Sequence, residues 1–236
     1  MSTVLITGAN RGIGLELCRQ YLSKDWQVMA TCRAPAAADE LQSLQNAHPR
    51  LEVFALDVTD LAAIDKLAAK LEGRPIDVLI NNAGIVGPVP VPEHIERQHF
   101  GTLDFDLWEQ VLRTNTFGPV KLSEALLPNI LAGELKKIVT LSSTVGSIVE
   151  RDTPAFAYAT SKTAVNKAMT LLAGVLREQG VTVALVCPGY VKTRLDFGTA
   201  DVEIADSAGA LIQRIDQFTL ADSGTFTRYN GETIAW

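Results

Sequence analysis

Tyr158 precedes Lys162 by four residues in the segment AFAYATSKTAVNKA, residues 155–168. On a helix, side chains four residues apart share one face, so the phenol and the ammonium group can reach the same pocket. A cation beside a phenol favours the phenolate and lowers the phenol pKa from its usual value of about 10. The spacing therefore predicts a proton donor for carbonyl chemistry. An ordinary Tyr and Lys on a surface helix are the alternative that this pair alone leaves open.

The elements that must position this pair can be read from the hydrophobic pattern. Short apolar runs rich in Val, Ile and Leu alternate with segments of helical period, and continuous hydrophobicity indicates strands covered on both faces. Strands are predicted over 3–8, 27–32, 51–57, 76–81, 137–143 and 181–189. Helices are predicted over 12–23, 36–46, 60–71, 104–132, 157–179 and 203–217. The alternation predicts an α/β protein with one domain over residues 1–236, a Rossmann fold whose doubly wound parallel sheet has about seven strands flanked by helices.

A glycine-rich turn, TGANRGIG, joins the first predicted strand to the first predicted helix. Glycines allow a tight turn there and let backbone N–H groups approach a pyrophosphate at the positive end of the helix. A turn with a purely structural role is the alternative. The cofactor-binding residues expected in this turn are Gly8, Asn10, Arg11, Gly12, Ile13 and Gly14.

The end of the second predicted strand, ATCR, indicates which dinucleotide binds. Folds that prefer NAD usually place an acidic residue there to bond the ribose 2′-hydroxyl, but Cys32 occupies that position and Arg33 follows it. Arg11 in the glycine turn offers a second guanidinium group. Guanidinium groups suit a 2′-phosphate, so the pattern predicts NADP(H) rather than NAD(H). Two solvated surface arginines are the alternative.

Two further strand ends are expected at the same edge of the sheet. Asp57, followed by Val58, can accept a hydrogen bond from the adenine amino group. The segment NNAG suits a backbone that passes close to the adenosine ribose, although either feature alone could be ordinary turn chemistry. The cofactor-binding residues expected in NNAG are Asn82, Ala83 and Gly84.

In order along the chain, TGxxxGxG, NNAG, a strand that ends in serine, YxxxK and a PG pair resemble the short-chain dehydrogenase/reductase family. The resemblance covers essentially the whole chain, and the tail is similar to that of C-factor-like and sniffer-type carbonyl reductases. It implies hydride transfer between NADPH and the carbonyl group of an aldehyde or ketone, or the reverse oxidation of an alcohol. A more specialised alcohol dehydrogenase or acyl-thioester reductase, and a nucleotide-binding signalling protein of C-factor type, stay open.

The resemblance also assigns catalytic roles. Tyr158 would be the general acid in reduction and the base in oxidation, and Lys162 would lower its pKa and bond the nicotinamide ribose. The family's substrate-binding serine lies three residues before a glycine, here Gly146, which selects Ser143 over Ser142. Ser143 would hydrogen-bond the substrate oxygen.

Two more contacts follow from the resemblance. Asn115, in the long fourth helix, would hold a water molecule for proton relay to the lysine. In the segment CPGYVKT, Thr193 would contact the nicotinamide carboxamide and fix which face delivers hydride. Local backbone hydrogen bonds are the alternative role for such Ser, Asn and Thr side chains. The cofactor-binding residues expected in this last segment are Pro188, Gly189, Val191 and Thr193.

Composition limits the partners and the compartment. The net charge of −6 argues against a general nucleic-acid binder, and no segment approaches the roughly 18 apolar residues of a membrane span. Three isolated cysteines indicate free thiols in a reducing compartment, so we expect a cytoplasmic protein. No metal is expected, because the three histidines are not spaced as ligands.

The expected substrate is a medium-sized apolar carbonyl compound. Loop 84–103 would supply an apolar wall from Val86, Val89, Val91, Ile95 and Phe100. Charge near the same mouth would come from Glu150, Arg151 and Asp152. Helices 104–132 and 157–179 are the expected surface of a homodimer, although the apolar residues of the second helix could equally all face the sheet. These residues are Ala164, Ala168, Leu171, Leu172 and Val175.

Overall fold

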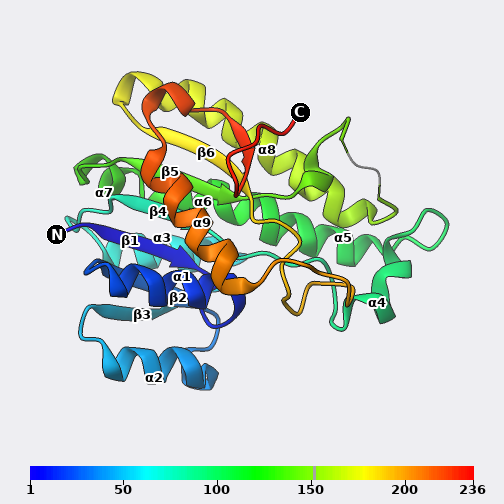
Figure 1. Cartoon of the computed structure of the whole chain (residues 1–236), viewed down its shortest axis with the longest axis horizontal. Coiled ribbons are helices and arrows are strands. Elements are labelled where there is room, and N and C mark those ends of the chain that lie inside the picture. Colours follow the sequence, from blue (N-terminus) through cyan, green and yellow to red (C-terminus); the bar gives the residue numbers. More distant parts are fainter. Residues whose placement is uncertain (151–152) are drawn as a thin grey trace.

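The computed structural model describes residues 1–150 and 153–236, and its strands form one seven-stranded parallel sheet (Figure 1). The sheet order is β3-β2-β1-β4-β5-β6-β7, so the direction of winding reverses between β1 and β4. This confirms the predicted doubly wound sheet, and the reversal marks the crevice where such sheets bind ligands. The strands are β1 (Thr3–Thr7), β2 (Gln27–Cys32), β3 (Leu51–Ala55), β4 (Val78–Asn81), β5 (Lys137–Leu141), β6 (Thr182–Cys187) and β7 (Phe226–Arg228).

The central strands are buried on both faces. Every residue of β1, β5 and β6 is buried, which is why these strands read as continuous rather than alternating apolar runs. β1 joins the two halves of the sheet, because it pairs with β2 on one side and with β4 on the other. In the seam with β4, Val4 lies opposite Val78 and Ile6 opposite Ile80.

Helices cover both faces of the sheet and enclose two apolar cores. In Figure 1, α9 crosses in front of the sheet beside α1, while α4 and α5 extend the molecule at one end. One face is covered by α1 (Gly12–Ser23), α2 (Asp39–Ala47) and α9 (Ile204–Gln217). The other face is covered by α3 (Leu61–Lys70), α6 (Gly118–Ala125), α7 (Leu127–Ala132) and α8 (Phe156–Leu176). The short helix α4 (Val91–His94) lies in the segment after β4.

The single helix predicted over 104–132 is wrong. The structure divides this segment into α5 (Phe105–Leu112), a π-helical turn (Arg113–Phe117), α6 and α7. Pro119 and Pro128 lie in the first turns of α6 and α7, where a residue without an N–H group is tolerated. Because Pro119 cannot donate, the Asn115 carbonyl oxygen lacks the partner that a regular helix would give it.

Other boundaries differ by a few residues. The helix predicted from 36 begins at Asp39, after a short 3-10 turn over Pro35–Ala37, and the strands predicted to reach 57, 143 and 189 end earlier. The alternative in which the named apolar residues of helix 157–179 all face the sheet is also wrong, because Leu171 and Val175 are exposed. No helix among the described residues is long and apolar enough to cross a membrane.

Candidate active site

The glycine turn and the segment after β4 are locked together. Asn82 Nδ2 donates hydrogen bonds to the carbonyl oxygens of Thr7 at 2.7 Å and Gly8 at 3.2 Å. A Cβ atom on Gly14 would lie 2.5 Å from Asn82 Nδ2, and one on Gly8, where φ is +66°, would lie 2.9 Å from Ala83 Cα. Only glycine fits at these positions, and the bare backbone that results at the start of α1 suits the phosphates of a dinucleotide.

The residues expected around this turn lie at the carboxyl edge of the sheet. Asn10 and Ile13 are half-buried, and Ile13 packs against the core under α1. Thr193 approaches from the segment after β6, because its Cγ2 atom would lie 3.7 Å from a Cβ on Gly12. The structure therefore brings Thr193 to the glycine turn, as a cofactor contact would require.

Three guanidinium groups gather beside the turn. The pKa of Arg11 is lowered by burial and by the neighbouring charges of Arg194 and Arg33. Arg33 thus lies near Arg11, as a 2′-phosphate site would require, but sequence reasoning missed Arg194. The signal for it was a basic residue directly after Thr193. The ion pairs found among residues 1–150 and 153–236 involve other arginines: Arg19, Arg50, Arg74, Arg97, Arg113, Arg214 and Arg228.

The adenine side of the site is tightly packed. Asp57 Oδ1 accepts hydrogen bonds from the N–H group of Thr59 at 2.9 Å and from its hydroxyl at 2.7 Å. Val58 is buried, and a Cβ on Gly118 would lie only 2.8 Å from the Val58 carbonyl oxygen. The first turn of α6 therefore holds the end of β3 in place, and one oxygen of Asp57 is committed to its own turn.

Ser143, Tyr158 and Lys162 meet at the carboxyl end of β5. The Ser143 side chain lies beside Tyr158, and Lys162 Nζ lies 5.8 Å from the centre of the Tyr158 ring. Lys162 Nζ donates a 2.8 Å hydrogen bond to the carbonyl oxygen of Leu141. A Cβ on Gly146 would lie 2.9 Å from Lys162 Cβ, so glycine is needed where the loop after β5 crosses α8.

Burial controls the ionisation of this pair. It raises the pKa of Tyr158 to about 12; nearby Cys187 adds to the rise and the hydrogen bond with Ser143 opposes it. Burial also lowers the pKa of Lys162 to about 8. Burial thus opposes the predicted lowering of the Tyr158 pKa by Lys162, because it favours the neutral form of both side chains.

Asn115 holds the backbone that follows NNAG. Its Oδ1 accepts the N–H of Ile85 at 2.9 Å, and its Nδ2 donates to the Ile85 carbonyl oxygen at 2.8 Å and to Ser161 Oγ at 2.9 Å. A Cβ on Gly84 would lie 3.3 Å from Asn115 Oδ1 and 3.7 Å from Lys162 Nζ. Both N–H hydrogens of the side-chain amide are thus used, and Pro119 leaves the main-chain oxygen of Asn115 without the donor that a regular helix would give it.

The segment after β6 forms a short loop over residues 190–202. Val191 pairs with Val202 across its base, and Ser207 Oγ donates a 2.7 Å hydrogen bond to the Pro188 carbonyl oxygen. Gly189 has φ +89°, and a Cβ there would lie 2.8 Å from the Tyr229 ring. Pro188, Gly189 and Val191, which were predicted to bind the cofactor, therefore form the base of this loop.

The expected substrate wall is only partly present. Val86 and Val91 are 4% and 1% exposed, so they belong to the packed interior rather than to a binding surface. Phe100 is largely exposed and lies beside Phe156, with ring centres 6.2 Å apart. Apolar residues of a loop are as readily used to anchor it as to bind a ligand, which the sequence could not distinguish.

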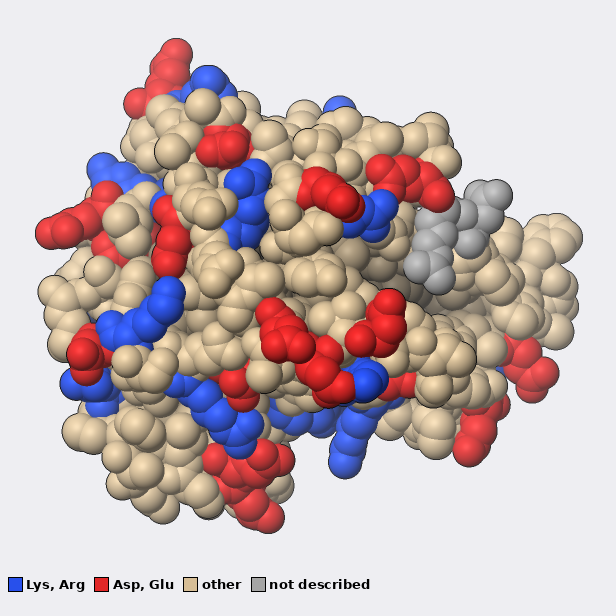
Figure 2. All heavy atoms as spheres, in the orientation of Figure 1, with Lys and Arg blue, Asp and Glu red and all other residues tan. Residues whose placement is uncertain are grey.

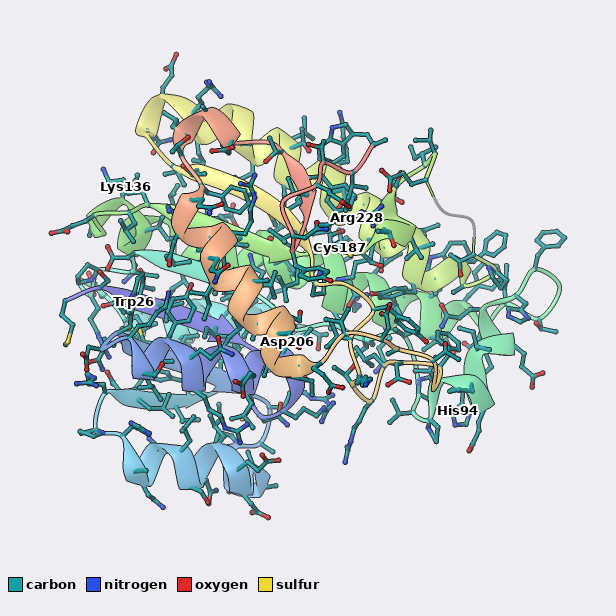
Figure 3. The ribbon with its side chains drawn as sticks, viewed as in Figure 1. Trp26, His94, Lys136, Cys187, Asp206 and Arg228 are labelled. Atoms are coloured by element: carbon teal, nitrogen blue, oxygen red, sulfur yellow. The ribbon has the colours of Figure 1, made fainter. Side chains whose placement is uncertain are left out.

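The charged residues expected near the mouth have a structural partner. Glu150 accepts a 2.7 Å hydrogen bond from the N–H of Ala235 and forms an ion pair with Arg228 at 2.7 Å. Arg151 and Asp152 lie outside the described residues. Figure 3 shows Arg228 beside Cys187 at the end of β6, while His94 lies far from both. Cys187 was missed as a neighbour of Tyr158 and Lys162, although its place directly before PG was the signal.

Other candidate sites fit this chemistry less well. A shallow groove between α1 and α9 is lined by Glu16, Glu203 and Asp206 among others, and its charge repels phosphate. In Figure 2, acidic side chains gather over the start of α9, within a surface of mixed charge. Across the described ranges, no three His, Cys, Asp or Glu side chains are grouped to hold a metal ion.

Comparisons with known proteins agree with the fold and the motifs. The family model for the short chain dehydrogenase matches residues 2–202. NADPH-bound carbonyl reductase from chicken fatty liver superposes with a TM-score of 0.88 at 32% identity, covering 100% of this chain and 99% of that chain. The carbonyl reductase Sniffer of D. melanogaster gives 0.87 at 32% identity and 100% of both chains. C-signal from Myxococcus xanthus is 31% identical over 163 residues, which is 69% of this chain and 93% of the relative.

The chain therefore belongs to the short-chain dehydrogenase family of oxidoreductases, as its ordered motifs predict. The matched residues 2–202 include the glycine turn, Ser143, Tyr158, Lys162 and the loop after β6.

Proposed function

We propose that this protein transfers hydride between NADPH and the carbonyl group of an aldehyde or ketone, with residues 1–236 acting as one NADP(H)-binding unit. The observation that carries the proposal is the meeting of Ser143, Tyr158 and Lys162 beside a glycine cradle that only a bare backbone can form. Two similar structures are named as carbonyl reductases, one of them bound to NADPH, which supports the same reaction here.

The side chains divide the work of reduction. NADPH, when bound, supplies the hydride. The hydroxyls of Ser143 and Tyr158 donate hydrogen bonds to the carbonyl oxygen, which stabilises negative charge as it develops there. Tyr158 then gives its phenolic proton to that oxygen, and the alcohol is formed. In the reverse direction Tyr158 accepts the proton of the alcohol.

Lys162 and Asn115 return the proton to Tyr158. With a pKa of about 8, the ammonium group of Lys162 is mostly protonated at neutral pH and favours the phenolate left after proton transfer. The Asn115 carbonyl oxygen, without a helical donor because of Pro119, is available to a water molecule near Lys162. A proton can then pass from solvent through this water and Lys162 to the tyrosine.

The choice of NADP(H) rests on the three gathered arginines. Arg33 and Arg11 offer charge to a ribose 2′-phosphate, and the acidic residue that would bond a 2′-hydroxyl is replaced by the buried Cys32.

Three buried free thiols support a reducing, cytoplasmic location.

A direct test follows NADPH consumption by its absorbance against a panel of apolar and charged aldehydes and ketones, with NADH in parallel. We expect turnover that prefers NADPH and apolar carbonyl compounds and that is lost in Tyr158→Phe. Turnover that is equal in Tyr158→Phe, or that requires NADH, contradicts the proposal.

The similarity to C-signal supports a second candidate, a signalling protein in which redox turnover is secondary. Expression of Tyr158→Phe in cells that lack the native gene distinguishes the enzyme from the signalling protein. A phenotype restored by this variant as well as by wild type favours signalling, whereas restoration by wild type alone favours the enzyme.

A second copy of the chain is the proposed partner of the outer face of α5, α6 and α8. Large apolar side chains are exposed along α5, the π-helical turn that follows it and α8: Phe105, Phe117, Leu171 and Val175. Such residues on adjoining helices favour association with an equally apolar surface. Sedimentation equilibrium should give a dimer, and Val175→Glu should shift it towards monomer; a monomeric wild-type protein rejects the assembly.

A further inference from the structure

A buried glutamine connects the segment after β4 to the helix that carries Tyr158. Gln98 lies in the loop expected to bind substrate, yet its side chain is only 1% exposed. Its Oε1 accepts a 2.9 Å hydrogen bond from the backbone N–H of Tyr158, and its Nε2 donates at 2.8 Å to the Val86 carbonyl oxygen. Both ends of the amide are therefore committed, one to the helix and one to the loop.

The start of α8 needs such an acceptor. The first N–H groups of a helix have no partner within the helix, and the residue before α8 is Ala155, whose side chain cannot accept a hydrogen bond. The regular bonding begins with the N–H of Ala159, which donates to the Ala155 carbonyl oxygen at 2.9 Å. Tyr158 lies one residue before that point, so Gln98 supplies from a distant segment the cap that the local sequence lacks.

The carbonyl group of Tyr158 is connected to the same loop through Ser161 of α8 and Asn115 of the π-helical turn. Ser161 Oγ donates a 2.7 Å hydrogen bond to the Tyr158 carbonyl oxygen and accepts one from Asn115 Nδ2 at 2.9 Å. Asn115 also holds Ile85, the residue next to Val86. The buried amides of Asn115 and Gln98 thus hydrogen-bond the consecutive loop residues Ile85 and Val86. Gln98 bonds the backbone of Tyr158 directly, and Asn115 does so through Ser161.

We propose that Gln98 is a positioning residue: by joining the Val86 carbonyl to the Tyr158 N–H, it fixes the height and direction of the Tyr158 side chain and ties them to the loop. The inference rests on the proposed role of Tyr158 as the acid. Gly87 is part of the arrangement, because a Cβ there would lie 3.2 Å from Gln98 Nε2.

The test compares three variants. Gln98→Met keeps the length of the side chain and removes both hydrogen bonds. Gln98→Glu keeps an acceptor for the Tyr158 N–H at a helix end that favours negative charge. Asn129→Leu is the matched control, because Asn129 is also a buried amide and donates to the carbonyl oxygens of Leu71 and Arg74, far from Tyr158 in the structure.

Two readouts separate positioning from simple stability. The first is kcat and KM with NADPH and an apolar aldehyde. The second is the 13C NMR titration of ζ-labelled tyrosine, in which only four tyrosines contribute and Tyr158→Phe assigns the signal. The ionisable groups that face Tyr158 are Lys162 on its own helix and Cys187 from β6, and neither is altered in any variant.

We expect Gln98→Met to lower kcat about tenfold or more, with the KM for NADPH within about twofold, and to shift the Tyr158 signal. Gln98→Glu keeps the bond to the Tyr158 N–H but sets a carboxylate oxygen against the Val86 carbonyl oxygen, so it should lower kcat, though less than Gln98→Met does. Asn129→Leu should lower the melting temperature without moving the signal. An unchanged kcat and signal in Gln98→Met overturns the inference. If that variant does not fold, an unchanged kcat in Gln98→Glu, which lacks the bond to Val86, overturns it.

The two proposals can fail separately. If wild type turns over no carbonyl compound, the proposed function fails, and the Tyr158 signal alone decides the role of Gln98. A signal that moves in Gln98→Met but not in Asn129→Leu supports positioning, and one that moves in neither or in both rejects it.

Discussion

The hydroxyl of Ser142 donates a 2.6 Å hydrogen bond to Oδ1 of Asn166, whereas the side chain of its neighbour Ser143 lies beside Tyr158. Consecutive residues of extended backbone point to opposite sides, so only one of the two serines can face the crevice. Asn166 Nδ2 in turn donates to the Gly146 carbonyl oxygen at 3.2 Å, which fixes the turn behind the catalytic pair.

The two serines should therefore respond differently to substitution by alanine. Ser143→Ala removes a donor to the substrate oxygen and should lower kcat about 100-fold with little change in stability. Ser142→Ala leaves Asn166 Oδ1 without its donor and should cost about 1–3 kcal/mol of stability with kcat within a few-fold of wild type. Steady-state kinetics and urea denaturation measure the two effects, and equal kcat losses would contradict the assignment.

Lys162→Met should inactivate the protein and yet stabilise it. The pKa of Lys162 is about 8 in the folded protein and 10.5 for an ordinary lysine, so burying the charge costs about 3 kcal/mol at neutral pH. The unfolded chain binds the proton more tightly, so wild-type stability rises with pH between these values. The advantage of Lys162→Met should be fully present below pH 8 and absent above about pH 10.5. A variant less stable than wild type at pH 7 would contradict this.

The arginines near the glycine turn should be separable by cofactor. Arg33→Ala should weaken NADPH binding about tenfold and leave NADH binding nearly unchanged, because only NADPH carries the 2′-phosphate. Calorimetric titration of Arg194→Ala then identifies its contact. Selective loss of NADPH affinity indicates the 2′-phosphate, and equal loss for both cofactors indicates the pyrophosphate. Arg19→Ala, in an exposed ion pair with Glu40, is the control.

Two glycines on the same layer of helices should give opposite changes in stability. A Cβ on Gly118 would lie 2.8 Å from the Val58 carbonyl oxygen, whereas one on Gly174, inside α8, meets nothing within 4 Å. Gly174→Ala should therefore stabilise by about 0.5–1 kcal/mol through helix propensity. Gly118→Ala should destabilise, since α6 must move off the end of β3. Thermal unfolding of both variants tests the pair, and stabilisation by Gly118→Ala would be the contrary result.

The arrangement of the sheet could be predicted because burial on both faces leaves a direct mark on composition. The runs that became β1, β5 and β6 are apolar throughout, and the glycines follow β1 where a turn requires them. β7 could not be located, because three residues at a sheet edge carry too little pattern. Pro119 signals a break in the helix predicted over 104–132, but the helical periodicity on both sides of it favoured one continuous helix.

The residues of the site that escaped prediction are brought to it by tertiary contacts between segments far apart in the sequence. Gln98 ends a short 3-10 helix and Arg194 lies in a turn, and their neighbours Tyr158 and Arg11 are far away in the sequence. Nothing local distinguishes them from solvated side chains. The effect of burial on the pKa of Tyr158 escaped prediction for a related reason: the nearby lysine is evident from spacing, whereas the degree of burial depends on how the loops pack around it.

Because the crevice lies at the seam between β1 and β4, dinucleotide binding there depends on the folding of both halves of the sheet. The glycine turn lies on one side of the seam, and Asn115, Ser143 and Tyr158 belong to the half that follows β4. A dinucleotide that spans both can be held only while the halves stay paired, so mass action couples its dissociation to unfolding. At a ligand concentration of 100 times Kd the gain is about 2.7 kcal/mol, which raises the melting temperature by several degrees for a chain of this size. A thermal-shift screen of nucleotides therefore ranks cofactors before any substrate is known.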